Sequence, residues 1–344
     1  MNKELKFSVV MPVYNMEKTI GESLASVLSQ TYDNFEVIIQ DNDSSDKTAK
    51  VVRSFSDPRI KYFKNDNNVG YLRNLIEGKK NCSGDILFYL AADDILAKNA
   101  LKETNVAFLK DENIGAVTRP YIWFYKNIDV PVRVTPILNE KEDEIVNIND
   151  FSKAAIAMHN EVLGQLSGLA FRLKYLEDSF FTTENQWIAH GYPFINIFKK
   201  HPIVMLKNYQ IAVRIESSSI RGSSDQSYVF SPTQRWVDML NEILSEKEYQ
   251  GFKNYFIKNV IAVNFVGFVQ IRSYSRLKFL LREICYLLKY KWSNIFDLKF
   301  WFFSLGCIFI PKAVLAKLTD WYKHKINSRM VKGVKFEYDI SRNY

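Results

Sequence analysis

The chain has 344 residues, 47% hydrophobic and 24% charged, which is a globular composition and excludes a disordered or fibrous protein. This length allows a large core, consistent with a catalytic domain and an appended region. The net charge of +8 is concentrated at one end, because residues 272–344 carry 15 Lys or Arg and 5 Asp or Glu, so charged partners are expected there.

The first hundred residues alternate short apolar runs with helical patterns. Turn residues bound the runs, which are Phe7–Met11, Phe35–Gln40, Ile60–Phe63 and Ile86–Leu90. Runs of this kind are typical of buried parallel strands, and the segments between them space apolar residues as one face of a helix does. The order predicts an α/β fold with a mostly parallel sheet flanked by helices.

The second half of the chain changes character. A helix is expected from about Leu96 to Leu109, and the polar run Glu216–Ser227 is expected to form a mobile loop that ends the first domain. Beyond Tyr228 the pattern is helical to the end. We therefore expect an α/β domain over residues 1–225 and a helical carboxyl-terminal region over residues 226–344.

The cysteines and histidines point to no bridged or zinc-bound scaffold. Cys82, Cys285 and Cys307 are widely separated, which is typical of a reducing compartment, and we expect a cytoplasmic protein. The four histidines lack zinc-ligand spacing. No uncharged run approaches the roughly 20 apolar residues that a membrane-spanning helix needs, so the chain is not expected to span a membrane, and lying on one stays open.

Two acidic groups directly follow expected strands and so fall on one edge of the sheet. Asp41 follows the second strand, and Asp93 and Asp94 follow the fourth. In open parallel sheets ligands bind beyond the carboxyl ends of the strands. Adjacent carboxylates in such a cleft need a balancing cation, and Mg²⁺ or Mn²⁺ uses one or two protein carboxylates. The alternative is that Asp94 caps the helix starting near Leu96 and that Asp93 is solvated.

Several nucleotide-binding and hydrolytic motifs are absent from the sequence. No Gly-x-Gly-x-x-Gly follows the first strand, and neither a Walker loop nor a Gly-x-Ser-x-Gly elbow occurs. These absences disfavour hydride transfer, P-loop chemistry and esterase chemistry. The absence of a glycine-rich basic loop after the first strand also disfavours a nucleotidyltransferase.

Four other motifs follow one another between residues 9 and 94. They are Val9–Asn15 (VVMPVYN), Phe35–Asp46 (FEVIIQDNDSSD), Asn68-Val69-Gly70 with Arg73-Asn74, and Gly84-Asp85 leading to Asp93-Asp94. Together they resemble the inverting family-2 glycosyltransferases, which have a GT-A fold. The resemblance implies direct displacement at the anomeric carbon of a nucleotide-diphosphate sugar.

The resemblance assigns residues 1–110 to donor binding, with a UDP-sugar as the usual donor. In the family, the residues that match Pro12, Val13 and Tyr14 flank the base and ribose. The residue that matches Asp41 hydrogen-bonds uracil. Simple packing remains the alternative for Tyr14, and a strand end the alternative for Asp41.

The resemblance also implies a metal ion and a contact to the diphosphate. The acidic pair that matches Asp93 and Asp94 holds ribose and Mn²⁺ or Mg²⁺, which neutralises the leaving diphosphate. Many members carry a further Asp where Ala91 stands, so metal binding depends here on the pair alone. Arg73 is a candidate diphosphate contact, with a surface helix position as the alternative.

The acceptor side, expected over residues 111–225, departs from the family pattern at the catalytic base. Where members carry a Glu-Asp pair, this chain has Glu184 followed by Asn185, and an amide cannot accept the proton. Glu184 is the first candidate for the catalytic base, Asp178 the second, and an unidentified residue remains open.

Other polar and aromatic residues of the acceptor side have open assignments. Trp187 and His190 are candidates for contact with the acceptor sugar, with core packing as the alternative. Arg214 and Arg221 are candidates for a lid over the diphosphate, and the sequence does not choose between them.

The carboxyl-terminal region combines apolar stripes with basic residues. Leucines recur at helical spacing over Leu277–Leu288, and an aromatic segment follows at Phe300–Ile310. This pattern predicts a helix lying in the plane of an inner-leaflet membrane surface, and the alternative is a cap packed on the catalytic domain. No nucleic-acid recognition motif accompanies the charge.

The combined expectation is a metal-dependent glycosyltransferase, peripheral on the cytoplasmic face of a membrane. Its acceptor would be a hydroxyl of a glycan or lipid-linked saccharide in capsule, lipopolysaccharide or other cell-surface polysaccharide biosynthesis. The alternative, prompted by Asn185, is a non-catalytic nucleotide-sugar-binding or scaffold subunit.

Overall fold

The computed structural model describes residues 4–159, 163–181, 189–215, 229–322, 331 and 333–341. The chain divides into two compact units: the first is Met1–Arg214 with Gly333–Tyr344, and the second is Ile215–Lys332. The sequence predicts one division near residue 225. The structure divides the chain at residue 214 and returns the last segment to the first unit.

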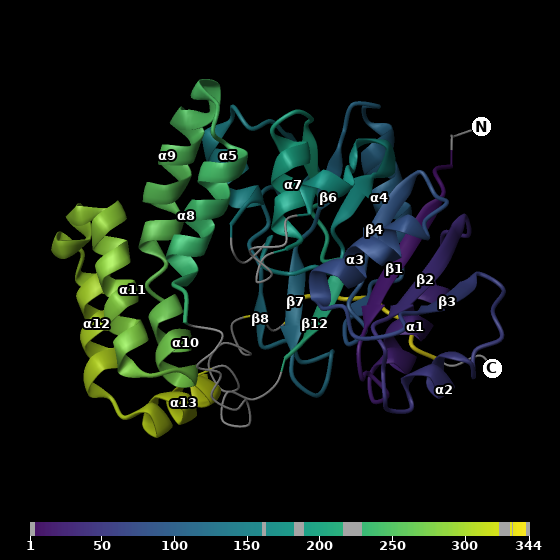
Figure 1. The fold of residues 1–344 in the computed structure, drawn as a ribbon, viewed down its shortest axis with the longest axis horizontal. Helices are drawn as coiled ribbons and strands as arrows, with labels where there is room; N and C mark the ends of the chain where they lie inside the picture. The colour runs from purple at the N-terminus through teal and green to yellow at the C-terminus, as the bar shows by residue number, and fades with distance from the viewer. Residues whose placement is uncertain are drawn as a thin grey trace. The chain divides into compact units, whose positions relative to one another are not determined.

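An eight-stranded sheet forms the centre of the first unit, in the order β3-β2-β1-β4-β10-β6-β11-β9 (Figure 1). Its strands are β1 (Phe7–Val13), β2 (Phe35–Asp41), β3 (Ile60–Lys64), β4 (Ile86–Tyr89), β6 (Ala116–Thr118), β9 (Glu144–Val146), β10 (Ala170–Arg172) and β11 (Ile203–Met205). Strands β1 to β4 pair in parallel, whereas β10 runs antiparallel to β4 and β6. The expected α/β fold with a mostly parallel sheet is confirmed.

A smaller sheet in the same unit has the order β5-β12-β7-β8. Its strands are β5 (Ile95–Leu96), β7 (Tyr121–Phe124), β8 (Arg133–Val134) and β12 (Ile211–Arg214). Because Ile95 and Leu96 pair with β12, the expectation of a helix starting near Leu96 is wrong. Helix α4 (Ala100–Leu109) begins after Asn99, so Asp94 does not cap it.

The segment 333–341 is extended and packs on this smaller sheet, which corrects the expectation of helix to the end of the chain. Alternate residues, Val334, Phe336, Tyr338 and Ile340, contact the cluster that contains Ile95. The backbone N–H of Lys98 donates to the Glu337 carbonyl at 2.8 Å. The chain therefore returns to the element that directly follows the acidic pair.

Helices pack on the sheets of the first unit. They are α1 (Ile20–Leu28), α2 (Thr48–Val52), α3 (Tyr71–Lys80), α4, α5 (Phe151–Ala157) and α7 (Gly191–Phe198). Helix α3 lies against β1 and β2. A Cβ at Gly78 would lie 2.6 Å from the Val10 side chain, so glycine permits this close approach. This packing fixes the amino end of α3 beside the carboxyl ends of the strands.

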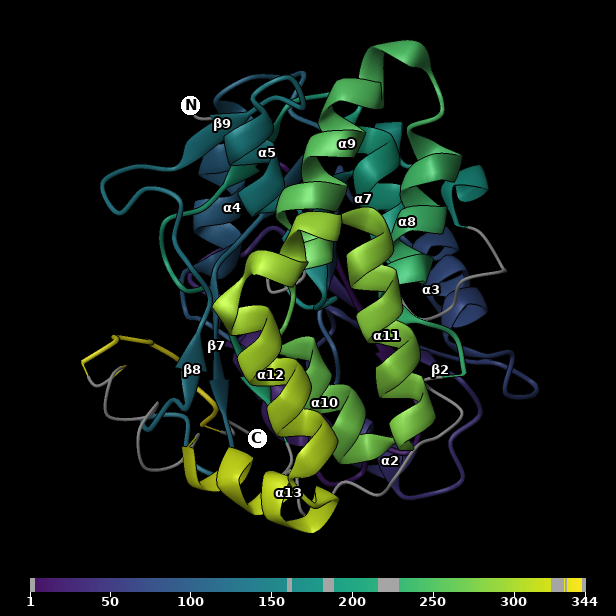
Figure 2. The ribbon, with the colours of Figure 1, turned by 90° about the vertical axis from the view of Figure 1, so that its left-hand side faces the viewer.

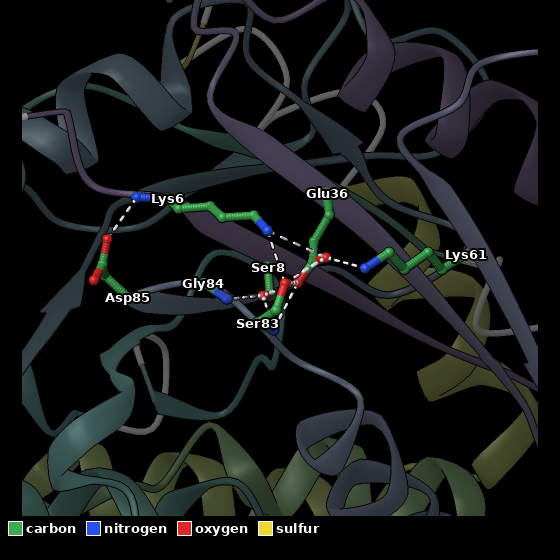
Figure 3. Close-up of polar contacts among 7 residues, drawn as sticks. All are labelled: Lys6, Ser8, Glu36, Lys61, Ser83, Gly84 and Asp85. Carbon is green, nitrogen blue, oxygen red and sulfur yellow. Dashed lines mark hydrogen bonds and ion pairs between the residues drawn. The ribbon is translucent and has the colours of Figure 1, made fainter.

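A buried ionic cluster ties the first strands together at the opposite, amino edge of the sheet (Figure 3). Glu36, only 3% exposed, accepts hydrogen bonds from Ser8 Oγ at 2.6 Å and from Ser83 N–H at 2.7 Å. Lys61 Nζ lies 2.6 Å from the other carboxylate oxygen. Burial opposes ionisation, yet hydrogen bonds from Lys61, Ser8 and Ser83 lower the pKa of Glu36 to about 2.

The second unit is helical in its described part. It contains α8 (Pro232–Ile243), α9 (Gln250–Asn259), α10 (Gly267–Tyr274), α11 (Leu277–Tyr290), the 3₁₀ turn η7 (Trp292–Phe296), α12 (Leu298–Phe309) and α13 (Lys312–Trp321). Helix α10 packs against α11, α12 and α13, and α13 crosses the ends of the others (Figure 2). Among the described residues, no helix has the length and apolar character needed to traverse a bilayer.

Candidate functional site

The loops after β1 and β2 are joined by hydrogen bonds at the carboxyl edge of the large sheet. Asn15 adopts a positive φ of 55°, which Asn tolerates better than most residues. Its N–H donates to Ser44 Oγ at 2.9 Å, and its Oδ1 accepts the N–H of Ser45 at 2.9 Å. These hydrogen bonds fix the loop that carries Tyr14, which is 46% exposed and lines a cavity.

The cavity measures about 480 Å³, within the usual range for small-molecule sites. Its lining comes from the ends of β1, β2 and β4, from the start of α3 and from the segment before β10. The lining residues are Pro12, Val13, Tyr14, Met16, Asn42, Asn68, Tyr71, Asn74, Ala91, Ala92, Asp93, Gly164, Gln165, Leu166, Ser167 and His190. The cavity therefore lies where an open parallel sheet binds ligands.

Side-chain amides form a connected network along one wall. Asn42 Nδ2 donates to Asn68 Oδ1 at 2.8 Å, and Asn65 Nδ2 donates to both Asn42 and Asn74 at 3.0 and 2.9 Å. Asn74 Nδ2 donates to the Gln40 carbonyl at 2.9 Å. A network with this many satisfied partners holds its members in fixed orientations, so the polar wall is preorganised.

The acidic pair divides its roles between the cavity and the protein interior. Asp93 lines the cavity, whereas Asp94 is only 3% exposed. Ser167 Oγ donates to Asp94 Oδ2 at 2.5 Å, and the backbone N–H of Arg214 donates to Asp94 Oδ1 at 3.0 Å. Burial, with the neighbouring Asp93 carboxylate, raises the pKa of Asp94 well above its usual range.

Arg214 holds the backbone of the acidic pair from the end of β12. Its Nε donates to the Asp93 carbonyl at 3.1 Å, and its guanidinium pairs with Glu22. The guanidinium also lies over the Phe124 ring, 4.8 Å from the centroid. These contacts fix Arg214 in place, in an arrangement that supports the turn rather than one that swings over the cavity as a lid.

Arg119 places a positive charge inside the protein near the pair. The side chain is fully buried, donates to the Gln165 carbonyl at 3.0 Å and lies 5.1 Å from the Tyr121 ring centroid. Burial lowers its pKa to about 10, and attraction to Asp94 opposes that shift. Arg119 thus supports both the cavity wall at Gln165 and the charge of Asp94.

His190 lines the cavity beside Tyr71. Its Nε2 lies 2.8 Å from the Leu163 carbonyl, and its Nδ1 lies 3.4 Å from the Tyr71 hydroxyl. Burial lowers the pKa of His190 to about 4, so the ring is neutral at pH 7. The carbonyl assigns the proton to Nε2, which leaves Nδ1 to accept from Tyr71.

Comparison with known proteins agrees with this geometry. Residues 8–158 match the family model for glycosyl transferase family 2. This part of the chain is similar to glycosyl transferase family 2. WfgD of Escherichia coli, a UDP-Glc:alpha-D-GlcNAc-diphosphoundecaprenol beta-1,3-glucosyltransferase, is 38% identical over 129 residues, which cover 38% of this chain and 51% of WfgD. The family resemblance is confirmed.

Solved structures show the same fold. TarS 1–349 of S. aureus in complex with UDP-GlcNAc matches with a TM-score of 0.58 at 16% identity, covering 98% of this chain and 97% of that one. The mannosyltransferase PcManGT of Pyrobaculum calidifontis, in complex with GDP-Man and Mn²⁺, matches with a TM-score of 0.52 at 15% identity, covering 94% and 89%. The expected GT-A fold is confirmed.

The residues at the cavity suit a divalent cation with a small protein ligand set. Within the described ranges, no three His, Cys, Asp or Glu side chains converge on one point. Asp93 faces the cavity beside a buried Asp94, so one or two carboxylates are at hand. That number fits Mg²⁺ or Mn²⁺, which retain water and substrate phosphate as further ligands.

Five residues predicted from the sequence share the cavity: Pro12, Val13, Tyr14, Asp93 and His190. These positions come from the ends of β1 and β4 and from the residue before α7, so the fold brings together side chains up to 178 positions apart. The structure therefore places these five side chains around one cavity, and their roles there stay predictions.

Asp41 and Arg73 lie outside the lining of the cavity. Asp41 is fully buried, accepts the Ser44 N–H at 2.8 Å and accepts the Tyr62 hydroxyl. Arg73 lines a separate polar hollow of about 300 Å³ with Lys64. Tyr71 and Asn74 take the cavity face of α3, which turns the Arg73 position to another face.

The remaining predicted residues are not part of the described cavity. Glu184, Trp187 and Arg221 lie outside the described residues. Asp178, the second candidate for the base, is exposed and forms an ion pair with Lys79. The prediction of Glu184 as the catalytic base therefore stays a prediction.

Sequence reasoning missed Ser167 and Arg119, which contact or support the acidic pair. A sequence signal exists for Arg119, because it is the single charge in the apolar run Ala116–Phe124. A lone charge in such a run is expected to be paired, since burial of an isolated charge is costly. Ser167 carries no comparable signal.

Proposed function

We propose that the chain is an inverting glycosyltransferase that moves a sugar from a nucleotide-diphosphate donor, with UDP-sugars the first candidates, to a hydroxyl acceptor. The observation that carries the proposal is the meeting of Tyr14 and Asp93 in one cavity at the carboxyl edge of the sheet. An exposed aromatic ring suits a nucleobase, and a carboxylate suits a ribose or a phosphate-bound cation.

Each part of the cavity has a proposed task. Pro12, Val13 and Tyr14 hold the base and ribose, and the amide network around Asn42 supplies fixed donors and acceptors to the nucleotide. Asp93 ligates Mn²⁺ or Mg²⁺, with the buried Asp94 beside it. When bound, the cation supplies electrostatic stabilisation of the departing diphosphate.

Residues at three further positions complete the donor and acceptor proposal. Asp41 accepts the Ser44 N–H and so orders the loop that carries Ser44. We propose that Asp41 affects uracil binding by positioning this loop, or that uracil replaces Tyr62 as its hydrogen-bond donor. Glu184 is proposed as the base that accepts the acceptor proton. Trp187 and His190 are proposed for the acceptor side, within residues 111–225.

The acceptor class is proposed from the relative with a stated substrate. WfgD is named for its action on a diphosphoundecaprenol-linked sugar, and this chain spans about half of its length. We propose a lipid-linked or glycan acceptor in capsule, lipopolysaccharide or similar polysaccharide synthesis, reached from the cytoplasmic face of a membrane.

A non-catalytic nucleotide-sugar-binding subunit is the second candidate, because Asn185 stands where the family carries its base. The test incubates the purified chain with UDP-, GDP- and CMP-sugars and Mn²⁺, with and without a crude lipid acceptor fraction, and follows release of the nucleotide. Release that requires acceptor and is lost in Asp94→Asn and Glu184→Gln supports the enzyme. Tight nucleotide binding without release on any acceptor supports the subunit and overturns the enzyme.

A further inference from the structure

Helix α12 is apolar on two opposite faces. One face, with Phe300 and Cys307, is buried in the cluster that α10, α11 and α13 share. The opposite face carries Leu298, Phe302, Leu305 and Phe309, which are 86%, 74%, 45% and 77% exposed. At about 3.6 residues per turn, these four side chains lie within roughly 60° of one another. An aligned apolar stripe on an exposed helix face marks an interaction surface.

Aromatic residues next to the helix extend this stripe. Trp292 and Phe296 of η7 are exposed and meet edge to face, with centroids 5.9 Å apart. Trp301 is also exposed, and its indole N–H donates to the Ile295 carbonyl at 2.7 Å. The exposed residues of η7 and α12 together are named the aromatic face; they are Trp292, Ile295, Phe296, Leu298, Trp301, Phe302, Leu305 and Phe309.

The charge around the aromatic face is positive. Between residues 276 and 322 there are eight Lys or Arg and three Asp or Glu. One of those acids, Glu283, is buried and accepts from Ser231 Oγ and the Thr233 N–H, so it adds little to the outer surface. Exposed Lys299 lies on α12 itself, and Lys312 begins α13 where α12 ends.

We propose that the aromatic face docks on an anionic lipid bilayer, with α12 lying in the plane of the surface. Phe302 and Phe309 would enter the acyl boundary, and the tryptophans would sit at headgroup depth, where their amphipathic rings are favoured. The lysines would meet anionic headgroups. The proposal rests on the proposed function only for its purpose, which is access to a lipid-linked acceptor.

A lipid surface fits the aromatic face better than a protein partner does. Protein interfaces are depleted of lysine at their centres, whereas in-plane membrane helices carry lysines beside their apolar stripe. Leu280 and Leu287 of the α11 stripe are buried in the helical unit, so they are not available for contact with a membrane surface. Of the two segments that the sequence predicts for the membrane surface, the aromatic one on α12 carries the larger exposed apolar surface.

The test measures co-sedimentation of the full chain with phosphatidylethanolamine vesicles, with and without phosphatidylglycerol. Wild type is expected to bind the anionic vesicles, and added salt is expected to weaken binding in part. Phe302→Glu with Phe309→Glu is expected to weaken binding at least about tenfold, because two apolar contacts are replaced by charge. Val106→Glu, at an exposed apolar position on α4, is the matched control and is expected to bind as wild type does.

Two readouts separate this proposal from others. Nucleotide release with a water-dispersed acceptor should be unchanged in the double variant, so a failed transfer assay and a failed docking assay are distinguishable. Unchanged vesicle binding by the double variant overturns the proposal. Absence of binding by wild type also overturns it, above all if sedimentation velocity shows a dimer that the double variant converts to monomer.

Discussion

Two groups of carboxylates lie at opposite edges of the same sheet, and each includes a side chain that is 3% exposed. At the amino edge, Glu36 has the Lys61 ammonium and hydrogen bonds from two serines, and its pKa falls to about 2. At the carboxyl edge, Asp94 has a second carboxylate as its neighbour, and its pKa rises. Burial raises the pKa of both groups, but the ammonium and the hydroxyl and amide donors outweigh it at Glu36, whereas the Asp93 carboxylate adds to it at Asp94.

The difference separates an acid that stabilises the fold from an acid that is ready for a ligand. The charge of Glu36 is balanced within the protein, whereas the charges of Asp93 and Asp94 repel each other beside a cavity. A bound cation would supply the balance that Lys61 gives to Glu36. The comparison predicts that substitution at one edge costs activity, and at the other edge stability.

Asp93→Asn is expected to have the largest effect on turnover. Loss of the carboxylate that faces the cavity should lower kcat at least about 100-fold, the scale seen when one preorganised electrostatic contact is removed. The free protein should be no less stable, because repulsion within the pair is relieved. Nucleotide release and thermal unfolding without metal measure the two effects.

Asp111→Asn is the control for this variant, since Asp111 is exposed just after α4 and its carboxylate accepts the Asn113 N–H. It should retain turnover within about twofold of wild type. If Asp93→Asn instead lost stability markedly and the folded protein kept normal turnover, the acid at the carboxyl edge would serve the fold and not the activity.

Glu36→Gln is expected to destabilise the fold and to leave turnover of the folded protein unchanged. A native pKa of about 2, against 4.5 for an ordinary Glu, corresponds to about 3 kcal/mol. Because the native pKa is depressed, this stability is present above pH 4.5 and is lost as the pH falls toward 2. Urea unfolding of wild type and variant at pH 7 and at pH 3 measures the change.

The difference in unfolding free energy between wild type and Glu36→Gln should be smaller at pH 3 than at pH 7. That result would support the role of the Glu36 charge in stability. Glu112→Gln, at an exposed position, serves as the control and should unfold as wild type does at both pH values. A difference that is independent of pH would mean that packing, and not ionisation, carries the role of Glu36.

Much of the donor half could be predicted from the sequence, because its information is local. The strand that ends near Pro12 and the acids after β4 occupy fixed places in a repeating β-α pattern, and parallel strands bring their carboxyl ends together. Ile95 and Leu96 were missed as a strand because their partner, β12, is more than a hundred residues away. The return of segment 333–341 is non-local in the same way.

The residues that hold the acidic pair in place could not be predicted for a related reason. Ser167 is 73 residues from Asp94 and carries no charge or periodic signal. Arg214 was weighed as a lid, yet its position is set by Glu22 and Phe124, which lie far from it in sequence. The sequence identifies the acids at the edge, while the three-dimensional packing identifies what holds them.

Tyr14→Ala is expected to weaken donor binding without affecting stability. Tyr14 is exposed at the cavity, so its removal deletes a stacking surface and little core packing. Stacking of a base on an aromatic ring is worth roughly 1–3 kcal/mol, which predicts an increase in Kd of about tenfold. Calorimetric titration with UDP measures it, and Tyr14→Phe, which retains the ring, should bind as wild type does.

Arg73→Ala is expected to have the smallest effect, with Kd for UDP within about twofold of wild type. Arg73 borders the hollow that Lys64 also lines, while Tyr71 and Asn74 of the same helix line the cavity. If Arg73 instead held the diphosphate, its removal would delete a charge-assisted hydrogen bond worth roughly 1.5–3 kcal/mol and raise Kd tenfold or more. Titration with UDP and with uridine distinguishes the two, because a diphosphate contact would weaken binding of UDP alone. If Arg73→Ala binds both UDP and uridine with affinities close to those of wild type, donor recognition is assigned to the cavity face of α3. The hollow beside Lys64 then takes no part in it.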